Sequence, residues 1–341
     1  MTHLIAYLPA PPFQDLSLGP LNFRLYGLCI ALGALAGVAI MRRRWQAMGG
    51  DPEDMTTIAL VAIPAGLIGT RIYHVITDWS RLYSGGRWWP DAFMIWKGGL
   101  GIPGGIVLGT LAGVLTARRL KVSVPLGFDA AAPAVPLAQA IGRIGNYFNQ
   151  ELFGRPTKVP WGLNVDVPYR PLKYAEYATF HPTFAYEALW NFGLVGFIVW
   201  AGKKIVLKPG RWFSVYLVGY GVGRFWVELM RSDTVTKLLG LRVNTWVSAL
   251  IFLVGIVWMF WGGSPVDSEA TAELRAGGNP REFAAGPGLA VLRGEVPAGA
   301  DATPSDAGAD TVAEQAGADV LVDDADLPSG PADGDPEDAQ E

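Results

Sequence analysis

The stretch from residue 21 to residue 41 reads LNFRLYGLCIALGALAGVAIM, and Arg42, Arg43 and Arg44 follow it directly. About 20 mostly apolar residues are enough for a helix to cross the hydrocarbon core of a bilayer. Comparable stretches recur and predict seven spans, at residues 21–41, 55–76, 98–117, 123–142, 182–201, 212–230 and 243–262. With 50% hydrophobic residues the chain is too apolar for an ordinary soluble domain, so we predict an all-α membrane protein.

Charge is divided unevenly along the chain. Residues 264–341 hold 18 acidic and 3 basic residues, which leaves 24 basic and 13 acidic residues in 1–263. A basic body suits work beside anionic lipid headgroups. Residues 264–341 are rich in Ala, Gly, Asp and Pro, lack an amphipathic period and contain one aromatic residue, Phe283. This segment therefore cannot bury enough apolar surface to fold. We therefore expect a transmembrane domain at 1–263 and an acidic disordered tail at 264–341.

Basic residues also predict the orientation. Residues 1–23 contain no Lys or Arg, whereas three arginines follow the first span, which favours an outside N-terminus and an inside first loop. Alternation then puts the segments 77–97 and 143–180 outside as a head region, and their Trp and Tyr residues suit the membrane interface. The acidic tail falls in the cytoplasm. The N-terminus lacks the basic region and the cleavage site of a removable signal peptide, so we expect the first span to stay.

Several ionisable residues lie within or beside the predicted spans. Such residues are costly in lipid and normally face a cavity or a partner. At the outer ends of the fourth, fifth and sixth spans the sequence has Arg143, Asn146, Glu151, His181, Glu187, Arg224 and Glu228. These residues converge on one leaflet in this topology, which predicts a one-sided polar site.

The most specific motif is the run GRIGNYFNQELFG at residues 142–154. It resembles the signature of the prolipoprotein diacylglyceryl transferases, and the resemblance extends over about residues 20–262. The other pieces that carry it are Tyr26, Gly98 and Gly99 followed by Gly104 and Gly105, His181-Pro182-Thr183 with Tyr186 and Glu187, and Tyr220, Gly223, Arg224, Phe225, Val227, Glu228 and Arg231.

The resemblance implies transfer of the sn-1,2-diacylglyceryl group from phosphatidylglycerol to the lipobox cysteine of a prolipoprotein, the first step of bacterial lipoprotein maturation. A thioether would form and glycerol phosphate would leave. The implied location is the bacterial inner membrane, and the implied partners are phosphatidylglycerol, the prolipoprotein signal peptide and membrane lipids. We expect a monomer, no cofactor and no nucleic-acid partner. His3, His74, His181 and Cys29 are scattered without the spacing of metal ligands, so no metal is implied.

This reaction needs cations near the scissile bond. Negative charge grows on the phosphate oxygens as the glyceryl carbon leaves them, and arginine pairs with phosphate while staying protonated. We predict that one of Arg143 and Arg224 holds the headgroup phosphate and the other favours departure of glycerol phosphate. The attacking sulfur must be a thiolate, so a proton acceptor is also desirable.

The identity of that base stays open. Many members of the family carry a histidine just before the second glycine pair, whereas this chain has Pro103 there. His181, Glu151, Tyr26 and His74 are the candidates. The predicted catalytic residues are Arg143, Arg224, Glu151, Tyr26 and His181. The predicted substrate-binding residues are Asn146, Gly98, Gly99, Gly104, Gly154, Glu187, Tyr220 and Glu228, with Arg231, Asp233 and Trp161 as weaker candidates.

Other interpretations apply to the same residues. The glycines between 98 and 113 suit close helix packing as well as a phosphate cradle. Arg224 and Glu228 could be a simple i, i+4 ion pair. For the whole protein the main alternative is a transporter or flippase for an anionic lipid, which the apolar inner halves of the spans disfavour. A serine hydrolase should show a Gly-x-Ser-x-Gly elbow, which the sequence lacks.

Overall fold

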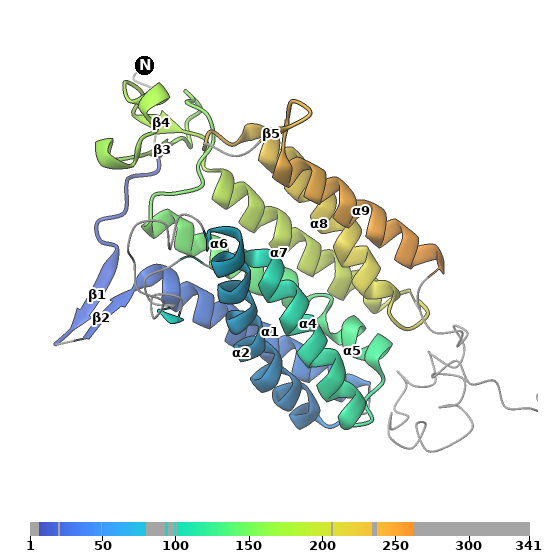
Figure 1. Ribbon diagram of the computed structural model, residues 1–341. Helices are drawn as coiled ribbons and strands as arrows, with labels where there is room; N and C mark the ends of the chain where they lie inside the picture. Colours follow the sequence, from blue (N-terminus) through green and yellow to red (C-terminus); the bar gives the residue numbers. More distant parts are fainter. Residues whose placement is uncertain are drawn as a thin grey trace, which may run out of the picture. The chain divides into compact units, whose positions relative to one another are not determined.

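The computed structural model describes residues 7–19, 21–48, 50–79, 93–94, 99, 101–205, 207–233 and 237–261, all within the unit Met1–Pro297. The predicted tail, most of the segment 77–97 and Gly98 lie outside the described residues. The described part consists mainly of long helices that run alongside one another (Figure 1). They are α1 Leu25–Ala47, α2 Pro52–Thr77, α4 Ile102–Arg119, α5 Val124–Ala131, α6 Ala134–Phe148, α7 Thr183–Gly202, α8 Arg211–Met230 and α9 Val243–Trp261.

Each predicted span contains helix, but not every helix meets the requirements of a membrane crossing. Among the described residues, five stretches are long and apolar enough to cross a membrane: α1, α2, Val124–Phe148, α7 and α9. Their outward surfaces carry large apolar side chains, such as Leu35, Leu60 and Leu250, as expected where lipid covers a helix. These features support a multi-pass membrane protein, while the number seven stays a prediction.

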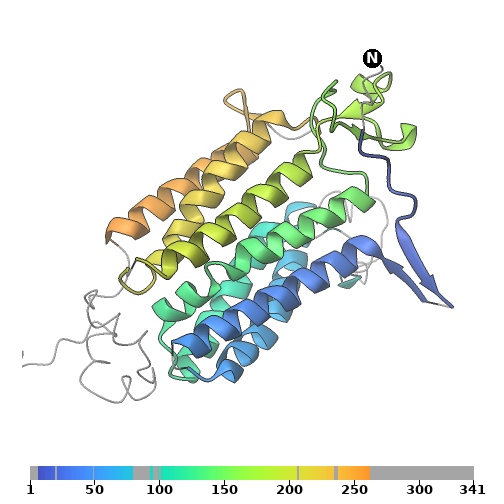
Figure 2. The ribbon, with the colours of Figure 1, turned by 180° about the vertical axis from the view of Figure 1, so that it is seen from behind.

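The structure is mostly helical, as predicted, and among the described residues three two-stranded antiparallel sheets accompany the helices. They pair β1 Asp15–Leu18 with β2 Leu21–Arg24, β3 Leu163–Asn164 with β4 Thr179–Phe180, and β5 Lys237–Leu238 with β6 Leu241–Arg242. All three lie at the same end of the helices (Figures 1 and 2). Two short 3-10 helices, η3 Val167–Tyr169 and η4 Leu172–Tyr174, lie between β3 and β4.

The boundaries of two predicted spans also change. Strand β2 takes the first residues of the predicted span 21–41, and α1 continues through Arg42–Arg44, since arginine favours helix and its long side chain reaches water. In the fourth span Pro133 separates α5 from α6, because proline cannot donate the backbone hydrogen bond that would continue the helix. Helix α6 then runs to Phe148, beyond the predicted end at residue 142, so Arg143 and Asn146 are helical rather than part of the outer segment.

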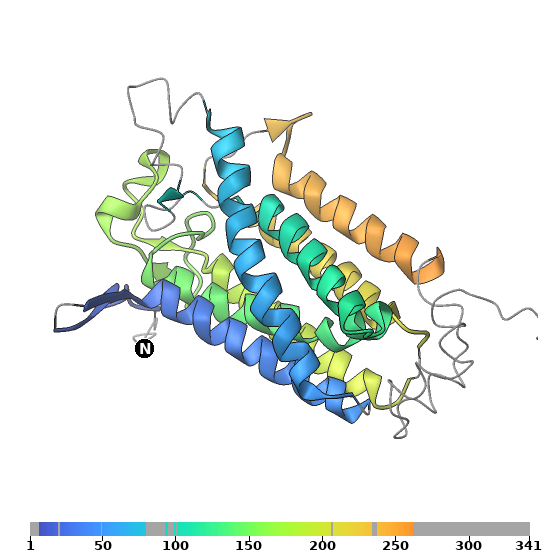
Figure 3. The ribbon, with the colours of Figure 1, turned by 60° about the horizontal axis from the view of Figure 1, so that its bottom comes forward.

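Glycines allow α2 and α4 to pack closely, and Figure 3 shows these two helices side by side. A Cβ on Gly69 would lie 2.3 Å from the carbonyl oxygen of Gly104, and a Cβ on Gly104 would lie 2.1 Å from that of Gly69. Neither position has room for a side chain. Gly105 packs in the same way against Thr70, so the packing interpretation of this glycine-rich stretch has a structural basis.

A small aromatic core anchors the long connection between α6 and α7. Its buried residues include Leu163 and Phe180 of the β3–β4 pair, and they are Phe153, Leu163, Val165, Phe180 and Phe184. Because this core joins the start of α7 to the loop after α6, it fixes the loop that carries the second half of the motif.

Candidate active site

The two arginines singled out in the sequence lie on either side of one carboxylate. Arg143 on α6 places Nη2 2.8 Å from Oε1 of Glu187 on α7, and Arg224 on α8 places Nη1 2.9 Å from Oε2 of the same residue. The Glu187 side chain is 5% exposed, and those of Arg143 and Arg224 are 19% and 11% exposed. Three helices are therefore joined at one largely buried ionic centre.

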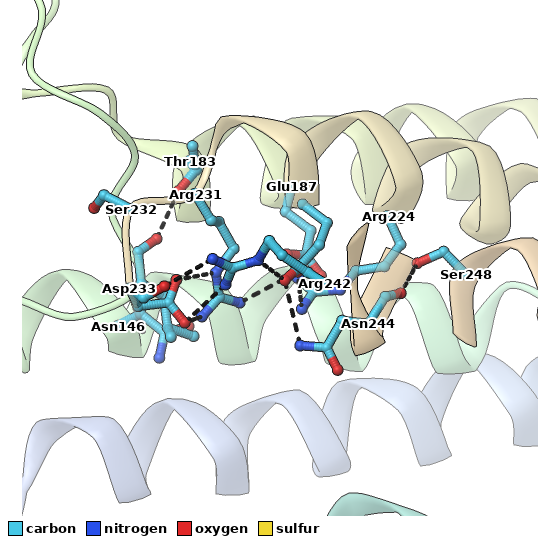
Figure 4. A network of polar contacts seen from close by, with 12 residues as sticks. Asn146, Thr183, Glu187, Arg224, Arg231, Ser232, Asp233, Arg242, Asn244 and Ser248 are labelled. Atoms are coloured by element: carbon cyan, nitrogen blue, oxygen red, sulfur yellow. Dashed lines mark hydrogen bonds and ion pairs between the residues drawn. The ribbon is translucent and has the colours of Figure 1, made fainter. Parts of the chain in front are cut away.

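Glu228 on α8 extends this centre. Its Oε2 lies 2.8 Å from Nη2 of Arg224, and its Oε1 accepts a 2.6 Å hydrogen bond from Nε of Arg242. Asn244 donates to the same Oε1 at 3.4 Å (Figure 4). The Glu228 side chain is 0% exposed, so this is not a simple surface i, i+4 pair. Burying a carboxylate this deeply is costly unless cations and hydrogen-bond donors surround it, as they do here.

Asp233, just after α8, extends the centre to the loop that follows this helix. Arg231 binds it through two nitrogens, at 2.7 and 2.9 Å, and Arg242 reaches it with Nη2 at 3.0 Å (Figure 4). Burial alone would raise the pKa of the Asp233 carboxyl, but the hydrogen bonds from Arg231 and the charges of Arg231 and Arg242 hold that pKa below its usual value. The centre thus unites four arginines with three carboxylates, so one positive charge is in excess.

Arg242 is a site residue that sequence reasoning missed. It directly precedes α9, where a basic residue resembles an ordinary interfacial anchor. A signal was present, because the predicted orientation puts this arginine at the outer end of a span, against the positive-inside tendency.

Asn146 links the arginine centre to Glu151. Its Nδ2 donates to Oε1 of Glu151 at 2.8 Å, and its Oδ1 accepts from Nη1 of Arg143 at 3.5 Å. Asn149 also donates to Oε1 of Glu151, at 3.0 Å. Asn146 is buried, so the motif positions Glu151 through a short chain of side-chain contacts from Arg143.

The backbone around Glu151 is strained. Gln150 and Leu152, on either side of it, have φ of 49° and 56°, which is uncommon for residues other than glycine. Gln150 is held by reciprocal hydrogen bonds with Asp166, of 2.6 and 2.8 Å. The carbonyl of Leu152 accepts a 2.6 Å bond from Oγ1 of Thr183. Such strain persists only where surrounding contacts fix the conformation, as they do here.

Both predicted tyrosines lie beside these charged groups. Tyr26, near the start of α1, packs against Gly145, where an added Cβ would lie 2.8 Å from its Cδ2. Its hydroxyl interacts electrostatically with Glu151 and Arg143. Tyr220 on α8 interacts in the same way with Glu187, Arg224 and Arg143.

His181 makes a different set of contacts. Its Nδ1 lies 3.1 Å from the hydroxyl of Tyr186, and that hydroxyl accepts a 2.8 Å bond from Nε1 of Trp161. Burial lowers the pKa of His181, which favours the neutral imidazole. His181 therefore contacts Tyr186, which in turn contacts Trp161. Tyr186 points from a different side of α7 than Glu187, which contacts the arginines.

At two of the predicted glycine positions, the structure shows a steric reason why no larger residue fits. A Cβ on Gly154 would lie 2.8 Å from Cγ2 of Thr183, and the Gly154 amide donates to the carbonyl of His181 at 2.7 Å. Gly99 has φ of 75°, and a Cβ there would lie 2.2 Å from Nε2 of His74. His74 itself pairs with Asp78 at 2.9 Å.

A mainly apolar cavity of about 680 Å³ begins at the arginine centre. Tyr26, Arg143 and Asn146 line its polar end. From there it follows α1, α2, α4, α5 and α6 to apolar side chains near their other ends, such as Met41, Met55, Val114 and Val124. The cavity volume lies in the range of small-molecule sites. Within the described residues no group of three or more His, Cys, Asp or Glu side chains could hold a metal ion.

These features define a helical membrane protein in which a buried arginine–carboxylate centre closes one end of an elongated apolar cavity. A family model described as prolipoprotein diacylglyceryl transferase matches residues 15–261. The chain belongs to this family of transferases, and the alternative of a transporter or flippase is not favoured.

Individual relatives agree with this assignment. The phosphatidylglycerol–prolipoprotein diacylglyceryl transferase 2 of Streptomyces coelicolor is 48% identical over 73% of this chain and 78% of its own length. The corresponding enzyme of Rhodococcus jostii is 44% identical over 81% of this chain and 80% of its own. That of Corynebacterium efficiens is 41% identical over 88% of this chain and 97% of its own.

Proposed function

We propose that this protein transfers the sn-1,2-diacylglyceryl group of phosphatidylglycerol to the lipobox cysteine of prolipoproteins. The observation that carries the proposal is the pair Arg143 and Arg224, joined through Glu187 beside the polar end of an elongated apolar cavity. The relatives are named for this reaction, and the family model covers the helices that form the centre and the cavity.

The acyl chains of phosphatidylglycerol occupy the apolar cavity, with the headgroup at its polar end. Along α1 the lining runs from Tyr26 to Met41, which corresponds to about 22 Å at roughly 1.5 Å per residue. That exceeds the ~15 Å depth of one leaflet, half of a hydrocarbon core of about 30 Å. The cavity is therefore long enough to take acyl chains while the phosphate stays beside Arg143.

Arg143 contacts the lipid phosphate, and Arg224 supports departure of the leaving group. Arg143 lines the cavity and is the more exposed of the two, and its paired carboxylate is Glu187. Arg224 pairs with both Glu187 and Glu228 and is held more firmly. A phosphate that binds Arg143 therefore competes with Glu187, and Arg224 keeps the displaced carboxylate neutralised.

The reaction replaces one bond at the glyceryl carbon. The cysteine sulfur attacks the sn-3 CH2 group of the diacylglyceryl moiety, the S–C bond forms, and the bond from that carbon to the phosphate oxygen breaks. The electron pair of that bond goes to the phosphate oxygen, and glycerol phosphate leaves. Arg143 and Arg224 stabilise the charge that develops on it.

Glu151 receives the thiol proton. It lies next to Asn146, which lines the cavity, and Tyr26 is close to both Glu151 and Arg143. His181 contacts Tyr186 and His74 contacts Asp78, so neither histidine contacts Asn146 or Arg143 in these pairs. Both are therefore weaker candidates than Glu151 for the base that accepts the thiol proton. Glu187, Tyr220 and Glu228 act as positioning residues for the arginines, while Gly99, Gly104 and Gly154 allow close backbone packing around the site.

The site faces the outer leaflet of the bacterial inner membrane, with seven crossings, an outside N-terminus and a cytoplasmic C-terminal tail. Basic residues at the opposite ends of the helices support this orientation. They include Arg42, Arg43 and Arg44 at the end of α1 and Arg118 and Arg119 at the end of α4.

A reconstituted transfer assay tests the function. Purified protein is incubated in detergent with phosphatidylglycerol and a lipobox peptide, and mass spectrometry follows the peptide while glycerol phosphate is measured separately. We expect a diacylglyceryl mass increment matched by an equal amount of glycerol phosphate, and no product from a peptide with serine in place of cysteine. Lack of both products with the intact peptide would contradict the proposal.

A cavity variant tests the lipid site. Ala34 lines the cavity, whereas Ala31 is exposed on the same helix and does not line it. The ring of Ala34→Phe would take cavity volume that the acyl chains need, and at a cost of roughly 1–3 kcal/mol, as for overpacking, it should raise KM for phosphatidylglycerol about tenfold and leave KM for the peptide unchanged. Ala31→Phe is the matched control. Equal behaviour of the two variants would place the lipid elsewhere.

A further inference from the structure

A second cavity, of about 550 Å³, lies at the other side of Glu151. Its lining comes from chain segments beyond the helix ends: the β1–β2 hairpin, the loop after α6, the η3 region and the loop after α8. The lining residues that matter here are Gln14, Asp15, Arg24, Glu151, Tyr169 and Asp233. In contrast to the apolar cavity, this one is therefore bounded by polar loop residues at the end of the helices where the sheets lie.

A hydrogen bond links one lining residue of each cavity. Glu151 lines the polar cavity, and its Oε1 accepts the 2.8 Å hydrogen bond from Nδ2 of Asn146. Asn146 lines the apolar cavity together with Arg143. A sulfur atom presented from the polar cavity at this pair would face a lipid whose phosphate is bound to Arg143.

The chemistry of the polar cavity disfavours a phosphate and favours a peptide. Three of its lining residues, Asp15, Glu151 and Asp233, are acidic, and one, Arg24, is basic. Asp233 is already paired with Arg231 and Arg242, so Asp15 and Glu151 set against Arg24 give the lining a weakly acidic balance that disfavours an anion. The side-chain amide of Gln14 can donate to or accept from a peptide backbone. Tyr169, which is 41% exposed and accepts a hydrogen bond from Gln14 at its hydroxyl, adds an aromatic surface.

We propose that the polar cavity binds the segment of the prolipoprotein that follows the lipobox cysteine. The inference rests on the proposed transferase function and specifies where its polypeptide substrate docks. The apolar segment before the cysteine stays in the bilayer, the sulfur reaches the Asn146–Glu151 pair, and the polar chain after the cysteine lies between the β1–β2 hairpin and the η3 region. Neutral and basic residues are preferred in that segment.

Photocrosslinking at matched tyrosines tests the docking site. Tyr169 lines the cavity, while Tyr177 is 53% exposed on the same connection and lies outside it. Each is replaced by p-benzoylphenylalanine in the full-length protein, turnover is checked to confirm a folded enzyme, and the lipobox peptide is crosslinked and mapped by mass spectrometry. We expect adducts from position 169 on residues after the cysteine and few from position 177. Adducts on residues before the cysteine, on lipid alone, or equally from both positions would overturn the proposal.

Charge reversal gives a second, independent test. Asp15 is exposed in the cavity, and Glu176 is an exposed acidic residue of the 143–180 segment outside it. Peptides with Lys or Glu two residues after the cysteine are compared. We expect the wild type to favour the Lys peptide in kcat/KM, and Asp15→Lys to reduce that ratio about two- to five-fold, as for an exposed charge pair. Glu176→Lys should leave it unchanged.

The two proposals fail differently. Absence of transfer in the wild type would remove the proposed function itself. Normal transfer with an unchanged Lys-to-Glu ratio in Asp15→Lys would leave the function standing and remove the polar cavity as the docking site for the chain after the cysteine.

Discussion

Replacing Glu228 with Gln should destabilise the protein strongly, although the two side chains have nearly the same shape. The Glu228 oxygens lie 2.8 Å from Arg224 and 2.6 Å from Arg242, and the residue is fully buried. At an effective dielectric constant of about 20, a charge pair at 2.8 Å attracts by roughly 6 kcal/mol before desolvation is subtracted. Glu228→Gln removes this attraction and leaves the arginines short of a carboxylate, for which the expected net loss is about 3–5 kcal/mol.

Thermal unfolding in detergent measures this loss. With roughly 2–4 °C per kcal/mol for a chain of this size, we expect Tm to fall by about 6–20 °C. Glu53→Gln is the matched control, since Glu53 pairs with Arg42 at 2.6 Å but its side chain is 63% exposed, and such surface pairs contribute about 0–1 kcal/mol. If the two variants melt within about 2 °C of each other, Glu228 is not the buried hub of an ionic centre.

Further outcomes follow from the same contacts. Glu187→Gln should remove the carboxylate partner of Arg143 and leave Arg224 paired with Glu228 alone, lowering turnover by about tenfold or more while the KM for the peptide stays constant, and an unchanged kcat would remove its positioning role. The pKa of Asp233 in the folded protein lies below its ordinary value of 3.8. The stability that this carboxylate contributes is therefore complete at pH values above its pKa in the unfolded chain, and it is lost as the pH falls through its pKa in the folded protein. The Tm difference between wild type and Asp233→Asn should therefore be largest near pH 7 and shrink toward pH 3, and a gap independent of pH would contradict this. Gly154→Ala should lower Tm and activity together, since no space exists for its methyl group, and normal behaviour would show that the loop yields easily. Removal of residues 270–341 should leave transfer at the wild-type rate, and loss of activity would assign the acidic tail a role.

The helices could be predicted from sequence because a bilayer demands long apolar runs, and those runs are visible without tertiary information. The hairpins could not. Strand β2 overlaps the start of the first apolar run, and a strand of four residues gives a weak pattern beside a span of about twenty. The end of α6 was also missed, since the polar residues of the motif, such as Arg143 and Asn146, suggested a loop although they lie on a helix facing α1 and the arginine centre.

The site could be predicted as a set of residues but not as a set of pairs. Charges within apolar spans identify Arg143, Glu187, Arg224 and Glu228, because lipid does not tolerate them singly. Which carboxylate each arginine contacts depends on the rotation of α6, α7 and α8 about their axes, which no local pattern encodes. The partner of Arg242 could not be predicted for the same reason: its position at the end of a predicted span against the positive-inside tendency is a signal, but its contact with Glu228 appears only in the structure.

The central claim is that Arg143 and Arg224 stabilise the phosphate as it leaves. The most direct test is the rate of thioether formation at saturating phosphatidylglycerol and peptide in Arg143→Ala and Arg224→Ala. Arg42→Ala, at the opposite end of α1, serves as the control. Loss of one donor to a developing anion typically slows the chemical step by about 100- to 1,000-fold, so we expect a decrease of that size in both variants and none in the control. A rate within about threefold of the wild type in either variant, where ~100-fold is predicted, would contradict the assignment.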